Sequence, residues 1–212
     1  MGRVLALVYD RLGARSEEAG MREERRRLLA RATGEVLEIG AGTGLNLVLY
    51  PPTVTRVVAV EPDRHMARRL RRKAHEAPMP VDVVSAAAEA LPLPTGSFDT
   101  IVGTLVLCTV LDPATVLAEV ARLLRPGGRY LFLEHVRAHD AGLARWQDRL
   151  APLWGVIGGG CHPNRVTLAS LRASPLTVAE VHEGRIPKAA PLVRPMITGV
   201  AERQANLATD VT

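Results

Sequence analysis

The sequence predicts an α/β fold in which one doubly wound domain is built around a mostly parallel sheet. Three observations support this prediction. Short apolar runs alternate with segments of helical pattern, an arrangement typical of parallel sheets. The first apolar run leads directly into a glycine-rich turn, Gly40-Ala41-Gly42-Thr43-Gly44. The second run, Val57-Val58-Ala59-Val60, ends at an acidic residue, Glu61.

Seven short apolar segments are expected to form strands: 35–39, 56–61, 81–85, 98–104, 129–135, 176–181 and 196–202. The last two are separated by a short segment, so we expect an antiparallel C-terminal pair added to the sheet edge. Helices are expected over 21–32, 45–50, 62–76, 112–124, 146–153 and 166–173.

Prolines and glycines set the expected boundaries of these elements. Pro51-Pro52 ends the second helix, and Pro62 is expected within the first turn of the third, where its missing N–H costs nothing. Asp112-Pro113 begins the fourth helix, and Arg125-Pro126-Gly127-Gly128 forms a turn before the fifth strand. Gly158-Gly159-Gly160 is expected to be a flexible joint.

The chain is expected to form a single domain over residues 1–212, without repeats or low-complexity tracts. Residues 1–30 would form a helical cap, 31–136 the cofactor-binding core, and 137–212 a substrate-side insert followed by the C-terminal strands.

Composition and charge restrict the partners. The net charge is +5, but aromatic residues make up only 3% of the chain, which disfavours a stacking surface for nucleic acid. No apolar run reaches the roughly 20 residues that a membrane span needs. We therefore expect a cytoplasmic protein that acts on a small molecule, with no nucleic-acid partner and no stable membrane insertion; the sequence leaves its oligomeric state open.

The two cysteines, Cys108 and Cys161, are far apart in the sequence, so a disulfide scaffold is not expected. Cys161-His162 resembles a metal-binding pair. Two adjacent residues make a poor tetrahedral site, however, and no C-x-x-C motif is present. We therefore expect no metal.

The charge around the glycine turn distinguishes two classes of nucleoside ligand. Dinucleotide sites use G-x-G-x-x-G and place a pyrophosphate on the helix N-terminus, whereas the glycines here are spaced G-x-G-x-G. Glu38, just before the turn, would repel a pyrophosphate but favour an ammonium group. S-adenosylmethionine (SAM) carries an ammonium, a sulfonium and no phosphate, so the residues favour SAM, with Glu61 on the ribose diol.

Glu38-Ile39-Gly40-Ala41-Gly42-Thr43-Gly44 resembles motif I of the class I SAM-dependent methyltransferases, which have a Rossmann-like fold. The resemblance continues in order through Glu61, Glu89-Ala90-Leu91-Pro92 and Leu123-Leu124-Arg125-Pro126-Gly127-Gly128. Many relatives have an aspartate for the adenine amino group where this chain has Ala87, which leaves adenine to backbone groups near Ala86, Ala87 and Ala88. The resemblance implies the following SAM-binding residues: Glu38, Gly40, Ala41, Gly42, Gly44, Asn46, Glu61, Pro62, Ala87, Ala88, Glu89, Thr104 and Leu105.

A narrower resemblance extends over nearly the whole chain. The motifs 104–110, Glu134-His135-Val136, Gly160-Cys161 and Leu192-Val193-Arg194-Pro195 are similar to the methyltransferase-like 7 group. In animals these proteins are membrane-anchored alkyl thiol methyltransferases. The resemblance implies a bacterial-type relative without their long N-terminal anchor, and a thiol as the methyl acceptor.

Methyl transfer to a thiol makes few chemical demands, because the sulfonium already activates the methyl group and a few per cent of a thiol is thiolate at neutral pH. His135, at the end of the fifth strand, is the first candidate for a direct chemical role. Thr104 and Leu105 are expected to line the methyl pocket, and Tyr9 and Asp10 to belong to a lid.

Other functions remain open at this point. The acceptor is alternatively a nitrogen, oxygen or carbon atom, for example of a phospholipid amine or a quinone precursor. An NAD-dependent oxidoreductase and a SAM-binding protein without catalysis are further alternatives.

Overall fold

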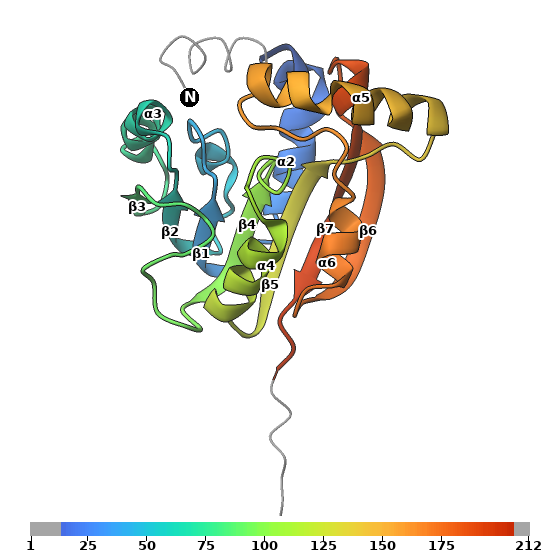
Figure 1. Cartoon of the computed structure of the whole chain (residues 1–212). Coiled ribbons are helices and arrows are strands. Elements are labelled where there is room, and N and C mark those ends of the chain that lie inside the picture. Colours follow the sequence, from blue (N-terminus) through green and yellow to red (C-terminus); the bar gives the residue numbers. More distant parts are fainter. Residues whose placement is uncertain (1–13, 206–212) are drawn as a thin grey trace, which may run out of the picture.

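The structure is a computed structural model that describes residues 14–205. Seven strands form one sheet in the order β3-β2-β1-β4-β5-β7-β6 (Figure 1). Strands β1 to β5 are parallel, and β7 pairs antiparallel with both of its neighbours. The strands are β1 Gly34–Ile39, β2 Val54–Val60, β3 Val81–Val84, β4 Phe98–Thr104, β5 Leu124–His135, β6 Thr177–Arg185 and β7 Pro195–Glu202.

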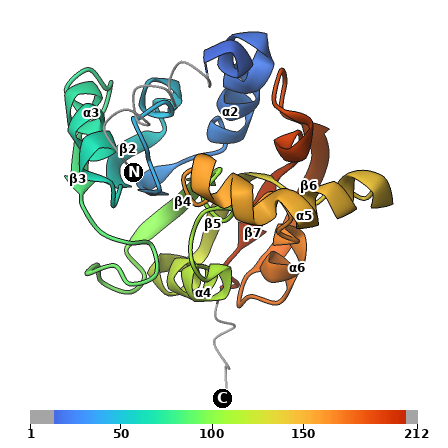
Figure 2. The ribbon, with the colours of Figure 1, turned by 45° about the horizontal axis from the view of Figure 1, so that its top comes forward.

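Helices cover both faces of the sheet (Figure 2). One face packs against α4 and α6 through residues such as Leu117 and Leu171, and the other against α2 and α3 through Leu29 and Leu70. Helix α5 crosses the edge at which the parallel strands end (Figure 1). The helical elements are η1 Glu17–Met21, α2 Arg22–Leu29, η2 Leu47–Leu49, α3 Arg64–Ala74, α4 Pro113–Leu123, α5 Ala141–Ile157, α6 Thr167–Arg172 and η3 Pro191–Val193.

The predicted fold class is confirmed: the protein is α/β, with a mostly parallel seven-stranded sheet and an antiparallel C-terminal pair. The order of the two C-terminal strands in the sheet was not predicted. The last strand, β7, enters the sheet between β5 and β6, so it pairs along its whole length with β5, from Arg129 opposite Glu202 to His135 opposite Met196.

Two predicted helix starts are wrong, both near prolines. Over 45–50 only the single 3-10 turn η2 forms, closed by the Leu49 N–H donating to the Asn46 carbonyl at 2.8 Å, because Pro51-Pro52 leaves no room for a further turn. Helix α3 begins at Arg64, since the Asp63 carboxylate caps it by accepting from the N–H groups of the next turn. Pro62 therefore precedes the cap instead of lying in the first turn.

Several other boundaries differ from the prediction in length. Helix α5 spans 141–157, not 146–153, because the Asp140 carboxylate caps it five residues earlier by accepting the Leu143 N–H. Strand β5 begins at Leu124, which pairs with Phe98, and the turn at 125–128 is a bulge within the strand. The glycines at 158–160 form the turn that ends α5, with positive φ at Gly159 and Gly160. None of the helices in residues 14–205 has the length and apolarity needed to cross a bilayer.

Gly199 in β7 tests the packing of the C-terminal strands. A Cβ added there would lie 2.6 Å from Cζ of Phe132 and closer still to the Glu180 carbonyl oxygen. We expect Gly199→Ala to lower the free energy of unfolding by about 1–3 kcal/mol, measured by urea denaturation. The control is Gly155→Ala in α5, where the nearest atom would lie 4.0 Å away and alanine favours the helix. Equal stability of the two variants would contradict the close packing of β7 between β5 and β6.

Candidate functional site

The glycine turn leaves β1 with a backbone that only glycine adopts readily. Gly40, Gly42 and Gly44 all have positive φ, at 59°, 57° and 80°. A Cβ at Gly40 would lie 2.6 Å from the Val106 side chain, and one at Gly44 2.9 Å from that of Leu70. At Gly42, by contrast, the nearest atom would be 4.0 Å away. The outer glycines thus permit close packing, whereas a Cβ at the middle one would meet no side chain of residues 14–205 within 4 Å.

The turn is held by hydrogen bonds to the neighbouring strand. The Ala41 N–H donates to the Val60 carbonyl at 2.9 Å, and the Gly44 N–H closes the turn onto the Ala41 carbonyl at the same distance. Glu61 accepts the Gly42 N–H on Oε2 at 2.9 Å and the Asp63 N–H on Oε1 at 2.8 Å. Glu61 is buried, and burial raises the pKa of its carboxyl, although both hydrogen bonds oppose this shift.

Glu38 lies in a buried polar network next to the turn. Its carboxylate accepts from Asn46 Nδ2 and from the Tyr50 hydroxyl, both at 2.9 Å. The Arg25 guanidinium donates from Nη1 to Asn46 Oδ1 at 3.0 Å and to Thr104 Oγ1 at 2.8 Å. Burial raises the pKa of Glu38 to about 7, against the effect of the two hydrogen bonds and of the Arg25 charge.

The network of Glu38, Arg25 and Glu17 has a net charge of about −1 when Glu38 is ionised. Arg25 pairs with Glu17 at 3.0 Å, so these two charges cancel. Three of the predicted cofactor residues, Glu38, Asn46 and Thr104, therefore come together. Arg25 and Tyr50 were missed, although Arg25 shares the helical spacing of Met21, Leu28 and Leu29 on the buried face of its helix.

A third buried carboxylate, that of Glu134, organises the loop after β4. Its Oε1 accepts the N–H groups of Val106 and Leu107, each at 2.9 Å, and Oε2 accepts that of Cys108 at 3.4 Å. Burial raises the pKa of Glu134 to about 7. Leu105, which leads into this loop, has a positive φ of 60°, and its N–H donates to the Leu133 carbonyl at 2.7 Å. The loop is thus pinned to β5 from both sides.

The remaining predicted cofactor residues lie around the loop after β3. Ala87 is exposed and Ala88 is buried in the core. The Glu89 carboxylate accepts the Leu111 N–H at 3.1 Å, so it connects this loop to the one after β4. Pro62 is exposed beside Glu61. Tyr9 and Asp10, the predicted lid, lie outside the described residues.

His135, the predicted chemical residue, ends β5 but does not stand alone. Its Nε2 lies 2.8 Å from Sγ of Cys161, while its Nδ1 is buried without a hydrogen-bond partner among the described residues. Cys108 Sγ donates to the Leu105 carbonyl at 3.4 Å. A hydrogen bond between the two cysteines is the main cause of their opposite shifts: the pKa of Cys161 is lowered to about 5 and that of Cys108 is raised.

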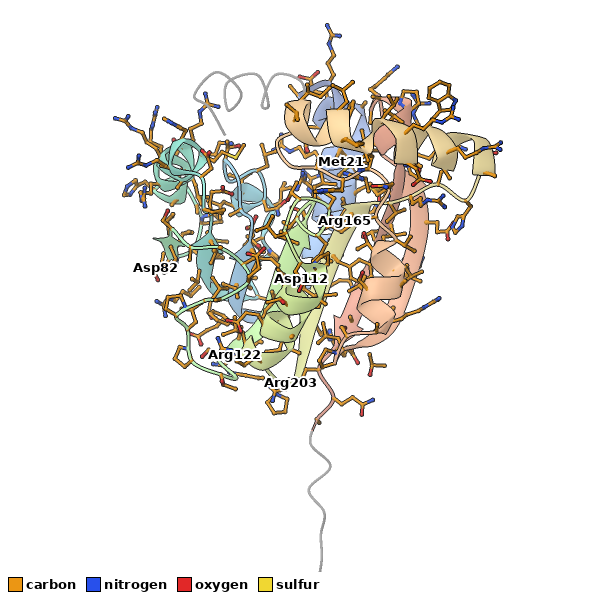
Figure 3. All side chains as sticks on the ribbon, viewed as in Figure 1. Met21, Asp82, Asp112, Arg122, Arg165 and Arg203 are labelled. Atoms are coloured by element: carbon orange, nitrogen blue, oxygen red, sulfur yellow. The ribbon has the colours of Figure 1, made fainter. Side chains whose placement is uncertain are left out.

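Arg165 lies beside this group, below α5 at the end of the sheet where β4 and β5 finish (Figure 3). Its Nη1 donates to the Leu107 carbonyl, and burial lowers the pKa of its guanidinium. The edge of the sheet thus carries a glycine turn flanked by the buried carboxylates of Glu38 and Glu61. Beside them lie the sulfur atoms of Cys108 and Cys161 and the imidazole of His135. Such an arrangement suits a phosphate-free, positively charged nucleoside cofactor.

Comparison with known proteins agrees with this chemistry. A family described as "Methyltransferase domain" matches residues 37–132. Thiol S-methyltransferase TMT1A from Homo sapiens is 35% identical over 170 residues, covering 78% of this chain and 69% of that protein. TMT1B from Homo sapiens is 40% identical over 149 residues, covering 68% of this chain and 61% of that protein. The chain thus spans only about two thirds of the length of these relatives.

A bacterial relative and a solved structure complete the comparison. Phosphatidylethanolamine N-methyltransferase from Cereibacter sphaeroides is 32% identical over 153 residues, covering 71% of this chain and 74% of that protein. A geranyl diphosphate C-methyltransferase from Streptomyces coelicolor, solved with S-adenosyl-L-homocysteine, has a TM-score of 0.65 at 13% identity and covers 87% of this chain and 76% of that one. The family decides between the two nucleoside ligands in favour of SAM. This chain belongs to the class I SAM-dependent methyltransferases.

Proposed function

We propose that this enzyme methylates the sulfur of a small hydrophobic thiol, and that it does so in the cytoplasm. The main support for a thiol acceptor is the similarity to the two human thiol S-methyltransferases, at 35% and 40% identity. The reaction moves the methyl group in line from the sulfonium to a thiolate, forming a thioether and releasing S-adenosylhomocysteine; the thiol proton goes to solvent. The leaving sulfur needs no acid, so the enzyme mainly has to align the reactants and exclude water.

The surroundings of His135 support a sulfur acceptor. The half-buried Arg165 guanidinium places a positive charge at this end of the sheet, which favours a thiolate over a thiol. Helix α5 crosses the same edge (Figure 2). It exposes the apolar side chains of Trp146, Leu153, Val156 and Ile157. An apolar surface beside the site suits the approach of a hydrophobic acceptor.

In this proposal the cofactor lies along the glycine turn, passing over Gly42. The ribose diol donates to Glu61, the ammonium faces the network of Glu38, and the methyl group points toward Thr104 and Leu105. Adenine lies near Ala87 and Ala88. His135, the last residue of β5, is proposed to face the acceptor.

An assay with several acceptors tests the thiol. The purified enzyme with SAM should convert alkyl thiols or hydrogen sulfide to methyl thioethers or methanethiol, detected by mass spectrometry. The similarity to a phosphatidylethanolamine N-methyltransferase makes an amine the second candidate. Turnover of phosphatidylethanolamine or a phenol, with no product from any thiol, would reject the thiol assignment.

Glu61→Ala tests the position of the ribose. Loss of hydrogen bonds to a charged carboxylate should weaken SAM binding by about 1–3 kcal/mol, measured by calorimetry. The control is Asp82→Ala on the neighbouring strand β3, an exposed acid paired with Arg56, which should leave SAM affinity unchanged. Unchanged affinity in Glu61→Ala would place the ribose elsewhere.

The pH dependence of SAM binding tests Glu38. Its pKa of about 7 in the free protein means that the carboxyl is mostly protonated at pH 6. The cofactor ammonium favours the ionised form, so binding below pH 7 must release this proton, and affinity should fall about tenfold from pH 8 to pH 6. Calorimetry at pH 6 in two buffers of different ionisation enthalpy measures the proton release directly. Glu38→Gln should bind SAM more weakly at pH 8 and lose the proton release. Wild-type affinity that is equal at pH 6 and pH 8 would contradict this role.

A further inference from the structure

Three side chains with metal-binding atoms meet at the end of β4 and β5. Cys108 comes from the loop after β4, His135 is the last residue of β5, and Cys161 lies in the turn between α5 and α6. Their donor atoms all lie within 4.8 Å of one another, and all three residues are buried. Residues from three separate parts of the chain thus direct two sulfur atoms and one imidazole nitrogen at one point.

The backbone holds these donors in place. Glu134 fixes the Cys108 loop through its hydrogen bonds to three consecutive N–H groups. The His162 N–H donates to the Cys108 carbonyl at 2.8 Å, which ties the turn of Cys161 to that loop. His135 is fixed by the pairing of β5 with β7, opposite Met196. Because these bonds already fix Cys108, His135 and Cys161, ligand binding would cost little further conformational entropy.

The donor set has a specific chemical preference. Two thiolates and one imidazole are soft and borderline ligands that favour Zn²⁺ and similar ions over Mg²⁺ or Ca²⁺. In a tetrahedral zinc site the two sulfur atoms lie about 3.8 Å apart, and a sulfur and a nitrogen atom lie about 3.5 Å apart. Both distances are shorter than the 4.8 Å within which all donor atoms of this cluster lie. The 2.8 Å contact between His135 and Cys161 would widen by several tenths of an ångström around an ion.

The protein alone does not satisfy the polar groups of this cluster. His135 Nδ1 is buried without a hydrogen-bond partner among residues 14–205. A metal bound to Nε2 would keep the ring proton on Nδ1, and an ordered water would serve as its hydrogen-bond acceptor. A divalent cation would also balance the charge of two buried thiolates.

The cluster lies next to the cofactor turn. The side chain of Val106, two residues before Cys108, packs so closely on Gly40 that no Cβ fits there. Three protein ligands leave one tetrahedral position free, as in catalytic rather than structural zinc sites. An exogenous sulfur ligand would fill that position, on the side of the sheet where the methyl group is expected.

We propose that Cys108, His135 and Cys161 bind a thiophilic divalent cation, Zn²⁺ being the best match, and that its fourth position takes up the acceptor thiol. The thiol proton passes to solvent as the metal–sulfur bond forms. A sulfur lone pair of the bound thiolate then forms the new bond to the methyl carbon, and the broken bond leaves its electron pair on the sulfur of S-adenosylhomocysteine. Metal binding stands independently; the role of the fourth position rests on the proposed thiol acceptor.

Cobalt substitution tests the metal site without any assay of activity. The full chain, reduced and freed of metal with a chelator, is titrated with Co²⁺ and then Zn²⁺. We expect one equivalent to bind, a thiolate-to-cobalt charge-transfer absorption to appear, and Zn²⁺ to abolish it. Cys161→Ser should lose most of that absorption, and His135→Gln should bind at least tenfold more weakly. His162→Gln, next to the cluster but without a donor atom in it, is the matched control and should behave like the wild type.

Alkylation of the wild-type protein gives a reading that does not depend on folding of the variants. Zn²⁺ should protect both cysteines of the native protein from alkylation, as determined by mass spectrometry. Absence of metal uptake, equal Co²⁺ spectra of the wild type and Cys161→Ser, or a Cys108–Cys161 disulfide in place of a metal would overturn the site.

The fourth position is tested on the cobalt protein in the absence of SAM. An alkyl thiol should shift the charge-transfer absorption, whereas an alcohol of the same chain length should not. A cobalt protein whose spectrum ignores thiols would overturn the acceptor role and leave the metal site standing. Because no methyl transfer is measured, this outcome differs from a failure of the thiol methyltransferase proposal.

Discussion

Burial of three carboxylates at the ends of parallel strands is the constraint on which this site depends. Glu38, Glu61 and Glu134 lie at the ends of β1, β2 and β5, and each is almost inaccessible to solvent. A buried carboxylate is costly unless donors surround it. Here the donors are loop N–H groups and the side chains of Asn46 and Tyr50. The cost of burial is therefore offset by bonds that fix the loops in place.

The same carboxylates explain why the edge of the sheet suits a cationic cofactor. When Glu38 is ionised, its network carries one negative charge, because Arg25 also pairs with Glu17, and an ionised Glu61 adds another beside Gly42. A preorganised site of this kind attracts an ammonium and a sulfonium and repels phosphate without needing to move. Arg165, which donates to the Leu107 carbonyl, adds a positive charge beside the loop of Val106 and Cys108.

Periodicity and turn residues were sufficient to predict the strands, their parallel pairing and the glycine turn, because these depend on local pattern. The predicted helix over 45–50 was wrong, because Pro51-Pro52 ends the segment before a full α-helix can form. The position of β7 between β5 and β6 depends on long-range strand pairing, which the spacing of the segments does not encode. Within the site, the Asp63 cap was not predicted, since the helix was expected to begin at Pro62, and the meeting of Cys108 with Cys161 was not predicted either. In the sequence, Cys161 was considered as a metal ligand together with its neighbour His162. In the structure, the histidine that meets the two cysteines is His135, at the end of β5.

The fold alone leaves the reaction open, because one scaffold supports many chemistries and the details lie in side chains at the strand ends. The most direct measurement is a crystal structure of the full chain with S-adenosylhomocysteine. We predict that the ligand lies over Gly42, with its ribose hydroxyls on Glu61 and its ammonium toward Glu38. A ligand bound elsewhere, or a turn that stays empty at saturating ligand, would contradict the account.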